Sequence, residues 1–348
     1  MVNVWNVHSN LVREINVHMP SISSLGFLRN SDGGNSIVTG SSSAGVIQIY
    51  DMASGELIIS FRHRGLKVTT VCEENRILVT GGSDGTIIIR DHHTGTIINA
   101  GGLTDVYALA VIPGENSRII SGGSDKMMNV WNTRTGEHLS CIETLSPIYT
   151  ITAKHSILAA GGRDRVVYVW ETSSFTMKGG LVGHEGVILS LVISEVPNST
   201  SISPTTVNTK ILDNDQLDLT SSTSGPVQDC SGGIIAESLS QEDPSTTATK
   251  LQVEGETAAI VVTTNTNPTK NKSVLVISAS ADKTIRVWDY LNGAMLYVFL
   301  GHSGAVTSLT VTHQPRTSWL ISGSFDGKVL LWDLNHLASE GELDMRDE

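Results

Sequence analysis

Short runs of alternating hydrophobic and polar residues recur along the whole chain, and glycine-rich turns separate them. In one example, Val274–Ile277 leads into Ser-Ala-Ser-Ala-Asp, and Lys283–Asp289 then reads Lys-Thr-Ile-Arg-Val-Trp-Asp. Alternation with a period of two residues is typical of half-buried β-strands, and the residues between the two runs favour a tight turn. The 33 glycines and 9 prolines among 348 residues suit many short strands joined by such turns. The pattern predicts an all-β protein.

Seven of these strands end on an aromatic-acidic pair or a similar dipeptide, and the pairs recur at a nearly constant interval. Successive pairs are separated by 45, 40, 41, 39, 118 and 44 residues, and removal of residues 195–272 reduces the interval of 118 to 40. Such a period predicts a repeated supersecondary unit. The pairs are Trp5-Asn6, Tyr50-Asp51, Arg90-Asp91, Trp131-Asn132, Trp170-Glu171, Trp288-Asp289 and Trp332-Asp333.

Within each repeat, a strand, a tight turn and a second strand follow one another. Thr80–Gly85 reads Thr-Gly-Gly-Ser-Asp-Gly, and Ser121–Lys126 reads Ser-Gly-Gly-Ser-Asp-Lys. Two further repeats place the dipeptide Gly-His before an alternating strand, at Gly183-His184 and at Gly301-His302. Each repeat therefore predicts a β-hairpin.

These repeats resemble those of the WD40 family, and the resemblance covers nearly the whole chain outside residues 195–272 and the C-terminal tail. It implies a β-propeller, in which blades of four antiparallel strands surround a central channel. The strands of a blade are lettered a to d from the channel to the rim. We therefore expect residues 1–194 together with residues 273–335 to form the propeller.

The number of blades depends on the two ends of the chain. Residues 1–6 align with residues 127–132, so the chain begins inside a strand c, and Leu11–Val17 follows as strand d. The last blade has strands a to c but no obvious strand d. The resemblance then implies seven blades, the first incomplete, in an N-terminally truncated sequence that lacks one contiguous d-a-b segment. The alternative is a six-bladed ring closed by Leu11–Val17.

Residues 195–272 form a Ser/Thr-rich acidic segment between strands a and b of one blade. The segment contains ten acidic residues, four basic residues and no aromatic residue. Because it cannot bury enough apolar surface to offset its ordering entropy, we expect a disordered insertion. It is either a passive loop or a phosphorylatable arm with Ser203-Pro204 as a candidate site. Its short apolar run, Ala258–Val262, either extends strand b or forms a pairing motif.

The net charge of −12 is concentrated in two segments. The insertion contributes −6 and residues 334–348 contribute −4, so the rest of the chain is nearly neutral. We expect residues 336–348 to be an acidic tail. Because the chain has no basic stripe to neutralise phosphates, its composition argues against nucleic acid as a partner.

No apolar run reaches membrane-spanning length, and the N-terminus lacks the pattern of a signal peptide. The sequence therefore predicts an intracellular protein, cytoplasmic or nuclear, that has no membrane partner. The three cysteines, Cys72, Cys141 and Cys230, fit neither a disulfide framework nor a zinc site. We expect two buried side chains and one loop thiol among them.

A histidine, a serine and an aspartate invite comparison with a nucleophilic triad. The family resemblance implies instead that they form a buried hydrogen-bond network with a tryptophan, which satisfies their polar groups and ties three strands together. An active site usually occurs once, whereas this set occurs twice. We therefore predict a structural role, no catalytic residue, no metal and no cofactor. The two sets are His184, Ser278, Asp282 and Trp288, and His302, Ser322, Asp326 and Trp332.

Other repeats depart from this set. Arg90 replaces the tryptophan of one repeat, and Ala44 stands where another should have its aspartate. The repeats of Asp125 and Asp164 have no histidine at the expected place. Complete networks are expected only in the last two repeats, so that local stability should be uneven.

On the family pattern, the b–c turns and d–a loops lie on one face near the channel mouth, where loops on a rigid frame are suited to bind partners. Phe325 stands out because a hairpin turn rarely exposes an aromatic side chain. Aromatic and arginine side chains are enriched in interface hot spots. The candidate partner-binding residues are Arg163, Arg165, Phe325, Lys126, Lys283, Arg64, Ser83 and Ser124.

The cations of this face suggest an acidic or phosphorylated peptide or protein as partner, unless they only solubilise the surface. The sequence therefore predicts a non-enzymatic scaffold for protein-protein interaction, as a subunit or adaptor of a larger intracellular complex, without a small-molecule substrate. The alternatives are an enzyme built on a propeller frame and a nucleic-acid-associated factor. An enzyme would need a non-repeated cluster of carboxylates, histidines or metal ligands at the channel mouth.

Overall fold

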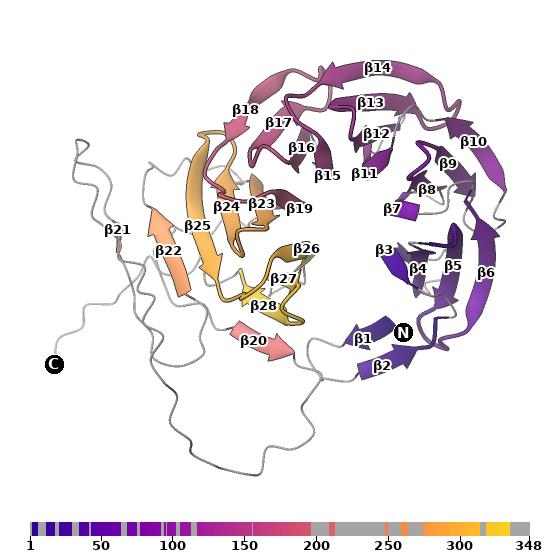
Figure 1. Cartoon of the computed structure of the whole chain (residues 1–348), viewed down its shortest axis with the longest axis horizontal. Helices are drawn as coiled ribbons and strands as arrows, with labels where there is room; N and C mark the ends of the chain where they lie inside the picture. The colour runs from indigo at the N-terminus through magenta and orange to yellow at the C-terminus, as the bar shows by residue number, and fades with distance from the viewer. Residues whose placement is uncertain are drawn as a thin grey trace, which may run out of the picture.

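Strands are the only regular elements in the part of the chain that the structure describes. This computed structural model describes residues 2–5, 12–17, 21–29, 35–41, 43–63, 68–74, 77–91, 94, 96–101, 105–112, 117–154, 156–195, 209–212, 248–249, 259–263, 274–313 and 318–334. Within these ranges, six antiparallel sheets of four or more strands are arranged radially as the blades of a propeller (Figure 1).

The first four blades are continuous in sequence. The first contains β3 (Ile22–Arg29), β4 (Asn35–Ser41), β5 (Val46–Asp51) and β6 (Leu57–Arg62). The second contains β7 (Val68–Glu74), β8 (Ile77–Gly82), β9 (Ile87–Asp91) and β10 (Ile97–Gly101). The third contains β11 (Val106–Ile112), β12 (Arg118–Gly123), β13 (Met127–Asn132) and β14 (His138–Glu143). The fourth contains β15 (Ile148–Lys154), β16 (Ile157–Gly162), β17 (Val167–Glu171) and β18 (Met177–Leu181).

The last two blades are built around the predicted insertion. The fifth contains β19 (Ile188–Glu195), β23 (Val274–Ser280), β24 (Ile285–Asp289) and β25 (Ala294–Leu300). The sixth contains β26 (Val306–His313), β27 (Ser318–Ser324) and β28 (Val329–Asp333). The innermost strands β3, β7, β11, β15, β19 and β26 are neighbours in this order around the channel. The strands of each blade therefore run from a at the channel towards the rim, as expected.

The aspartate found in the b–c turns of all blades but the first explains why the repeated pattern folds locally into a hairpin. Asp282 Oδ1 accepts a hydrogen bond of 2.9 Å from the backbone N–H of Thr284. The intervening residue, Lys283, has a φ of 72°, and Gly327 occupies the corresponding place in the last blade with a φ of 79°. A side-chain acceptor followed by a left-handed residue closes a tight turn, so the motif specifies the turn by itself.

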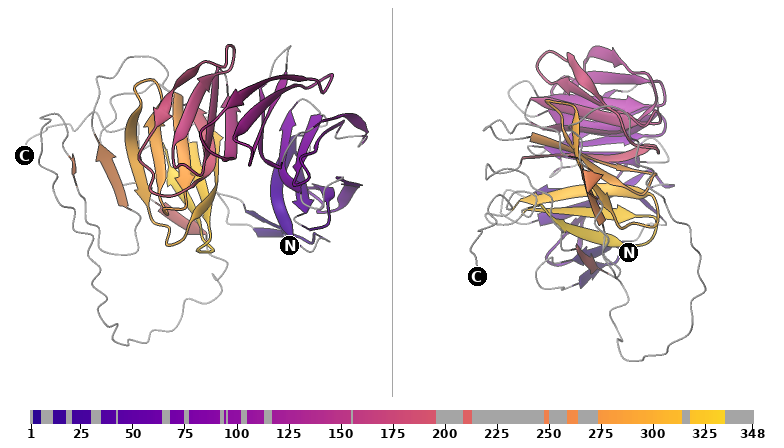
Figure 2. Two further views of the ribbon diagram at one scale, coloured as in Figure 1. Left: turned by 45° about the horizontal axis from the view of Figure 1, so that its top comes forward. Right: turned by 90° about the vertical axis from the view of Figure 1, so that its left-hand side faces the viewer.

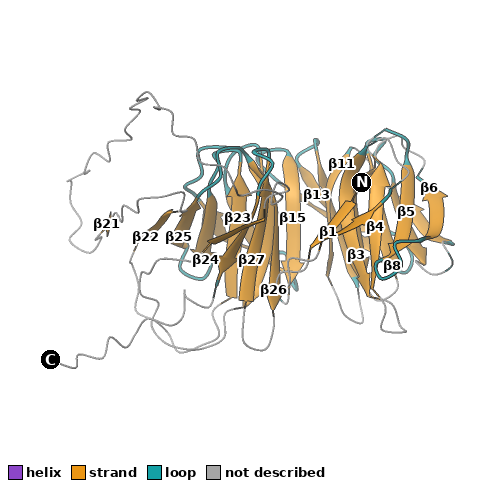
Figure 3. Ribbon diagram, turned by 90° about the horizontal axis from the view of Figure 1, so that it is seen from below, coloured by secondary structure: helices purple, strands orange, loops and turns teal. Residues whose placement is uncertain are grey.

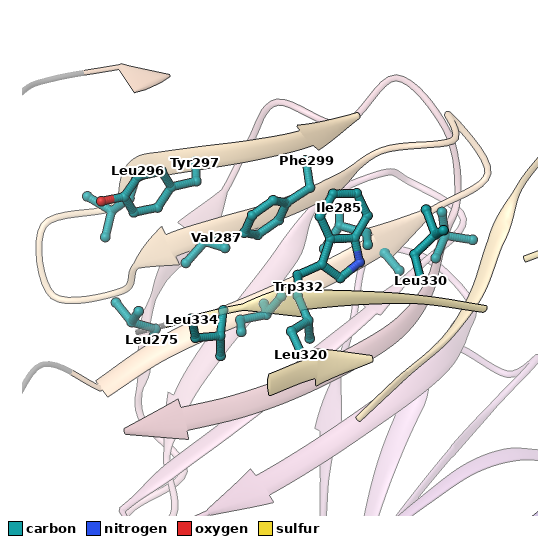
Figure 4. Packing of buried hydrophobic residues seen from close by; sticks show 13 residues of the cluster. Leu275, Ile285, Val287, Leu296, Tyr297, Phe299, Leu320, Leu330, Trp332 and Leu334 are labelled. Atoms are coloured by element: carbon teal, nitrogen blue, oxygen red, sulfur yellow. The ribbon is translucent and has the colours of Figure 1, made fainter. Parts of the chain in front are cut away.

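The hydrophobic core lies between adjacent blades. Between the fifth and sixth blades, Trp332 is fully buried and packs against Phe299 with ring centroids 4.9 Å apart (Figure 4). Ile285 and Val287 of β24 and Leu320 of β27 belong to the same cluster. Because successive side chains of a strand point to opposite faces, a central blade buries apolar groups against both of its neighbours.

The two N-terminal strands form a separate sheet beside the first blade. β1 (Val2–Trp5) pairs antiparallel with β2 (Val12–Ile15), and Ile15 packs with Tyr50 of β5. These strands are the predicted c and d of an incomplete blade, next to the six blades of the alternative interpretation. The six blades of the alternative are confirmed, but its closure by Leu11–Val17 is not, because β2 pairs with β1 alone among the described strands.

Three short strands are described within the predicted insertion, which lies between strands a and b of the fifth blade. β20 (Thr209–Leu212) pairs with β28 and takes the place of strand d in the sixth blade. β21 (Ala248–Thr249) pairs with β22 (Ala259–Thr263), which pairs with the outer edge of β25 (Figures 1 and 2). Within the run Ala258–Val262, the described residues Ala259–Val262 thus pair with strand d and do not extend strand b, and Ala258 lies outside the described residues. The rest of the insertion and the tail 336–348 lie outside the described residues.

Candidate functional site

The b–c turns and d–a loops share one face of the propeller, which we call the loop face. The backbone N–H groups of Arg163, Ala281 and Phe325, all in b–c turns, donate hydrogen bonds to carbonyl oxygens of d–a loops at 2.9 to 3.2 Å. In a view of the edge of the propeller, loops lie on two opposite sides of the strands (Figure 3). The loop face is therefore a continuous surface on which turns from one element support loops from another.

Most of the predicted partner-binding residues lie on this face with their side chains in solvent. Phe325 is 82 % exposed. Ser83 is half-buried, and Arg64 lies outside the described residues. The other exposed members of the set are Lys126, Ser124, Arg163, Arg165 and Lys283.

Two apolar residues of the loop face were not among the residues predicted from the sequence. Leu145 lies in the d–a loop between the third and fourth blades and is 78 % exposed. Val182 lies in the next d–a loop and is 74 % exposed. Both could have been found in the sequence, because each is a large apolar residue just after a strand d, where a polar residue is expected in a solvated loop.

Exposed cations and apolar side chains share the loop face from the third to the sixth blade. In chain order the row is Lys126, Leu145, Arg163, Arg165, Val182, Lys283 and Phe325. Glu143 and Glu185 are exposed beside it, and Arg165 donates a hydrogen bond of 3.4 Å to the backbone carbonyl of Glu185. The row therefore combines positive charge with apolar contact area, two features of protein-binding surfaces.

The first predicted network is assembled in the fifth blade from residues far apart in the sequence. His184 lies 2.7 Å from Asp282 through Nδ1 and 2.7 Å from Ser278 through Nε2. The indole N–H of Trp288 donates to Ser278 Oγ at 2.8 Å. With the imidazole neutral, its Nδ1–H donates to the carboxylate and its Nε2 accepts from the serine hydroxyl, so that each polar group has a partner.

The sixth blade repeats this arrangement. His302 lies 2.9 Å from Asp326 and 2.8 Å from Ser322, and Trp332 donates to Ser322 Oγ at 2.9 Å. In both blades the carboxylate also accepts the backbone N–H of the residue that follows the histidine. Each network therefore joins a d–a loop, a strand b, a b–c turn and a strand c.

The two networks are poorly placed for nucleophilic chemistry. Ser278 and Ser322 are both 0 % exposed, so no substrate can approach either hydroxyl without opening the blade. Each hydroxyl already accepts an indole N–H. These contacts fit a structural strut and leave no reacting position about 3 Å from the nucleophile.

The surroundings of the networks shift several pKa values. Burial lowers the pKa of His184 below its usual value of 6.5 although Asp282 favours its charged form, and burial likewise lowers the pKa of His63. Burial alone would raise the pKa of Asp282 and Asp326, but hydrogen bonds outweigh it. The main donor to Asp282 is His184. The main donors to Asp326 are the backbone N–H of Lys328 and the imidazole of His302, and they lower the pKa of Asp326 to about 2.

These shifts predict that the propeller loses stability in acid. Below pH 6.5 the unfolded chain binds protons at His63 and His184 that the folded chain excludes, and below pH 3.8 it also binds a proton at Asp326 before the folded chain does. Stability therefore falls as the pH falls. The melting temperature measured from pH 7.5 to pH 4 is expected to decrease continuously below pH 6.5. A constant melting temperature between pH 6.5 and pH 5 would contradict the histidine contribution.

The third and fourth blades lack the histidine, and the polar residues of the set that they retain have other hydrogen-bond partners. In the third, Trp131 donates to Ser121 at 2.8 Å, and a cavity of about 10 Å³ is lined by Ser121, Asp125 and other residues. The cavity has room for no more than one water molecule. In the fourth, Tyr168 donates its hydroxyl to Asp164 at 2.8 Å, and burial raises the pKa of Tyr168 to about 12. Sequence reasoning missed this tyrosine, which lies on strand c, four residues after the aspartate.

In the second blade, Arg90 occupies the place of the tryptophan. It is 3 % exposed, donates through Nη2 to the carbonyl of Arg62 at 2.6 Å, and lies over the ring of Phe61 at 4.7 Å. Burial lowers the pKa of Arg90, and its Nε and Nη1 atoms have no partner. A buried cation with two unpaired donors replaces an indole, so this blade is expected to be less stable than the last two.

Metal and membrane sites are not apparent in the described ranges. There, no three side chains of the histidine, cysteine, aspartate and glutamate types lie close enough to share a metal ion, and no helix could cross a bilayer. Cys141 is exposed because it lies on the rim strand β14, so its expected burial is wrong. Cys230 lies outside the described residues.

The radial blades, the aspartate turns and the two buried networks define a β-propeller of the WD40 type. The family model for the WD domain, G-beta repeat, matches residues 258–289 and 293–333. The fold is similar to the computationally designed Ika8 protein, with a TM-score of 0.57 and 22 % identity over 95 % of this chain and 77 % of that chain. It is also similar to a chain of the Mitotic Checkpoint Complex, with a TM-score of 0.62 and 16 % identity over 95 % and 83 %.

The repeats at residues 258–289 and 293–333 are WD40 repeats, and WD-repeat proteins are among the relatives of this chain. It is 40 % identical over 68 residues to WD repeat-containing protein 97 of Homo sapiens and 38 % identical over 65 residues to small ribosomal subunit protein RACK1 of Caenorhabditis elegans. It is 35 % identical over 79 residues to COMPASS component SWD3 of Saccharomyces cerevisiae. These matches cover 20 %, 19 % and 23 % of this chain, and 4 %, 19 % and 24 % of the respective relatives.

Proposed function

We propose that this protein is a non-enzymatic interaction scaffold whose loop face binds an acidic or phosphorylated segment of a partner protein. The observation that carries the proposal is the row of exposed apolar residues, Leu145, Val182 and Phe325, with cations between them. Exposed large apolar groups clustered on one face of a rigid frame mark a binding surface. Two relatives support a role in assemblies, since one is named as a ribosomal subunit protein and one as a COMPASS component.

The chemistry of the row favours a partner segment that combines negative charge with apolar side chains. Arginine can bind a carboxylate or a phosphate through two parallel hydrogen bonds, which supports Arg163 and Arg165 as anchors for the charge. Phe325 and Leu145 would then bury apolar groups of the same segment. The acidic insertion and tail begin at the opposite face, after β19 and β28, and so do not start next to this row.

The two alternative functions have less support. The two serine-histidine-aspartate sets give the enzyme hypothesis little support, because the hydroxyl groups of Ser278 and Ser322 are buried inside the networks. The nucleic-acid hypothesis would rest on the same few cations, in a chain with a net charge of −12. Both alternatives predict behaviour that the scaffold does not, namely turnover of a substrate or binding to a duplex that falls steeply with salt. We propose that the scaffold acts inside the cell, in the cytoplasm or nucleus.

A paired substitution tests the loop face directly. Arg163→Glu combined with Phe325→Ala reverses one charge and removes the exposed ring, and it is expected to lower recovery of specific partners by about tenfold or more, as loss of interface anchors does. Recovery is measured by affinity purification with quantitative mass spectrometry, followed by titration of the purified partner.

The matched control places a similar pair of changes on the opposite face. Arg134 and Leu291 are exposed in c–d turns, so Arg134→Glu with Leu291→Ala alters charge and apolar surface equally without touching the loop face. This variant should retain every partner. If the loop-face pair retains them equally well, the assignment of the loop face is wrong.

A further inference from the structure

The rim strand of the fifth blade differs from the other strands d. Tyr297 and Phe299 are each 1 % exposed, and Leu296 and Val298 are also buried, so four consecutive residues of β25 are shielded from solvent. Elsewhere the rim strand is open: in β6 and β14 most positions are exposed. Leu296, Tyr297 and Phe299 pack in the core cluster shared with the sixth blade, and Val298 is buried as well, so this strand excludes solvent from both of its faces.

A strand of the insertion pairs with the outer edge of this strand. β22 lies antiparallel to the outer edge of β25, with Ala259 opposite Leu300 and Val262 opposite Tyr297. Figures 1 and 2 show it outside the blade. It comes from the short apolar run of an otherwise polar segment, so the apolar part of the insertion meets the apolar rim strand.

The connection between β22 and the blade is long enough to allow this pairing and short enough to favour it. Ten residues join the end of β22 at Thr263 to the start of β23 at Val274, and they can span about 33 Å when extended. β22 lies three strand spacings from β23 in the sheet, a distance of roughly 14 Å. Both ends lie on the side of the c–d turns, because β22 and β25 are antiparallel. A short tether gives the segment a high effective concentration at the rim.

The same insertion contacts a second rim. β20 pairs with β28 in the sixth blade, with Thr209 opposite Trp332 and Leu212 opposite Val329. No strand d from the chain after β28 is found among the described residues. β20 and β22, both from the insertion, thus pair with the outer edges of β28 and β25. Pairing of this kind protects a sheet edge from pairing with other chains.

We propose that the outer edge of β25 is a strand-docking site and that its occupant is the chain's own segment Ala259–Thr263, which straps the insertion to the rim. Backbone hydrogen bonds hold the segment, as when an extended peptide adds to the edge of a sheet. The insertion is then a structural part of the fifth blade. Its release would uncover β25 as an edge for other extended segments.

Hydrogen exchange on the full chain tests the strap. In Val261→Pro combined with Val262→Pro, one of the two lost N–H groups must point at β25, since neighbouring N–H groups of a strand point to opposite sides. Those amides of residues 296–299 that point at β22 are expected to exchange at least about tenfold faster, because their edge is no longer covered. Residues 148–181 of the fourth blade should keep their wild-type rates.

The matched control introduces the same pair of prolines elsewhere in the insertion, as Ser222→Pro with Thr223→Pro. It should leave the exchange of β25 unchanged. Unchanged exchange of β25 in the Val261/Val262 variant, or equal acceleration in both variants, would overturn the proposal.

A cross-link provides a second test that does not depend on prolines. Val261 and Val298 are direct partners in the register, so Val261→Cys with Val298→Cys should form a disulfide under mild oxidation, within the Cα separation that such bonds allow. Val261→Cys with Leu139→Cys offers an exposed rim position on β14 and should cross-link at least about tenfold less, because the effective concentration there is lower. Equal yields from the two pairs would refute the docking site.

Discussion

Replacement of Trp332 by alanine is expected to lower the free energy of unfolding by about 3–5 kcal/mol, the range found for large aromatic residues removed from a core. Trp332 is 0 % exposed and packs on Phe299 between the fifth and sixth blades. Its indole N–H also donates to Ser322, which completes the buried network. The change therefore leaves both a cavity and a hydroxyl without its donor. Denaturant unfolding followed by circular dichroism measures the loss.

Trp332→Phe separates the two contributions. The phenylalanine keeps most of the apolar volume and removes only the N–H donor, so the expected loss is about 1–2 kcal/mol. If alanine and phenylalanine destabilise equally, the hydrogen bond to Ser322 dominates. If alanine costs less than about 1 kcal/mol, this tryptophan does not join the blades as described.

Replacement of Gly162 by alanine is expected to cost about 3 kcal/mol, at the upper end of what overpacking a core usually does. A Cβ at this position would lie 1.9 Å from the backbone carbonyl oxygen of Pro147. That carbonyl accepts the N–H of Arg163 at 3.2 Å, so the d–a loop cannot withdraw without breaking a bond that supports the loop face. The loss is measured by the same unfolding experiment.

Gly179→Ala is the matched control, because a Cβ there would meet no atom within 4 Å. Its effect should be within about 0.5 kcal/mol, as for surface substitutions away from special features. Gly162→Ala should also weaken partner binding through Arg163, whereas Gly179→Ala should not. Equal stability of the two variants would show that the d–a loop shifts without cost.

The two networks connect stability to the proposed function. His184 and His302 begin d–a loops, and their hydrogen bonds to Asp282 and Asp326 hold those loops against the b–c turns. The turn that contains Phe325 is therefore held by the bond from His302 to Asp326 and by the bond from the N–H of Phe325 to the carbonyl of Ala305. A rigid loop face loses less entropy when it binds a partner than a mobile one does.

The repeat pattern by itself determined much of this molecule. Alternating strands, the aspartate turns and the period near 40 residues specified the hairpins and blades, and the family resemblance implied the partners of Trp288 and Trp332. These features are predictable because they are local, or because the same local pattern recurs in each blade. The exposure of Phe325 could be predicted for the same reason, since its position in a hairpin turn is set by the residues around it.

Contacts between segments far apart in the chain were decided only by the tertiary structure. The sequence alone left the pairing of Ala258–Val262 open, and it did not indicate that β20 would lie beside β28. It also did not indicate that Tyr168 would hydrogen-bond to Asp164, or that Leu145 and Val182 would be exposed on the same face as Arg163. Strand pairing at an open edge uses backbone groups that every residue carries, so the side-chain pattern alone cannot name the partner. The sequence by itself thus determined the blade, and only the assembled structure decided what covers its edges and what its loop face presents.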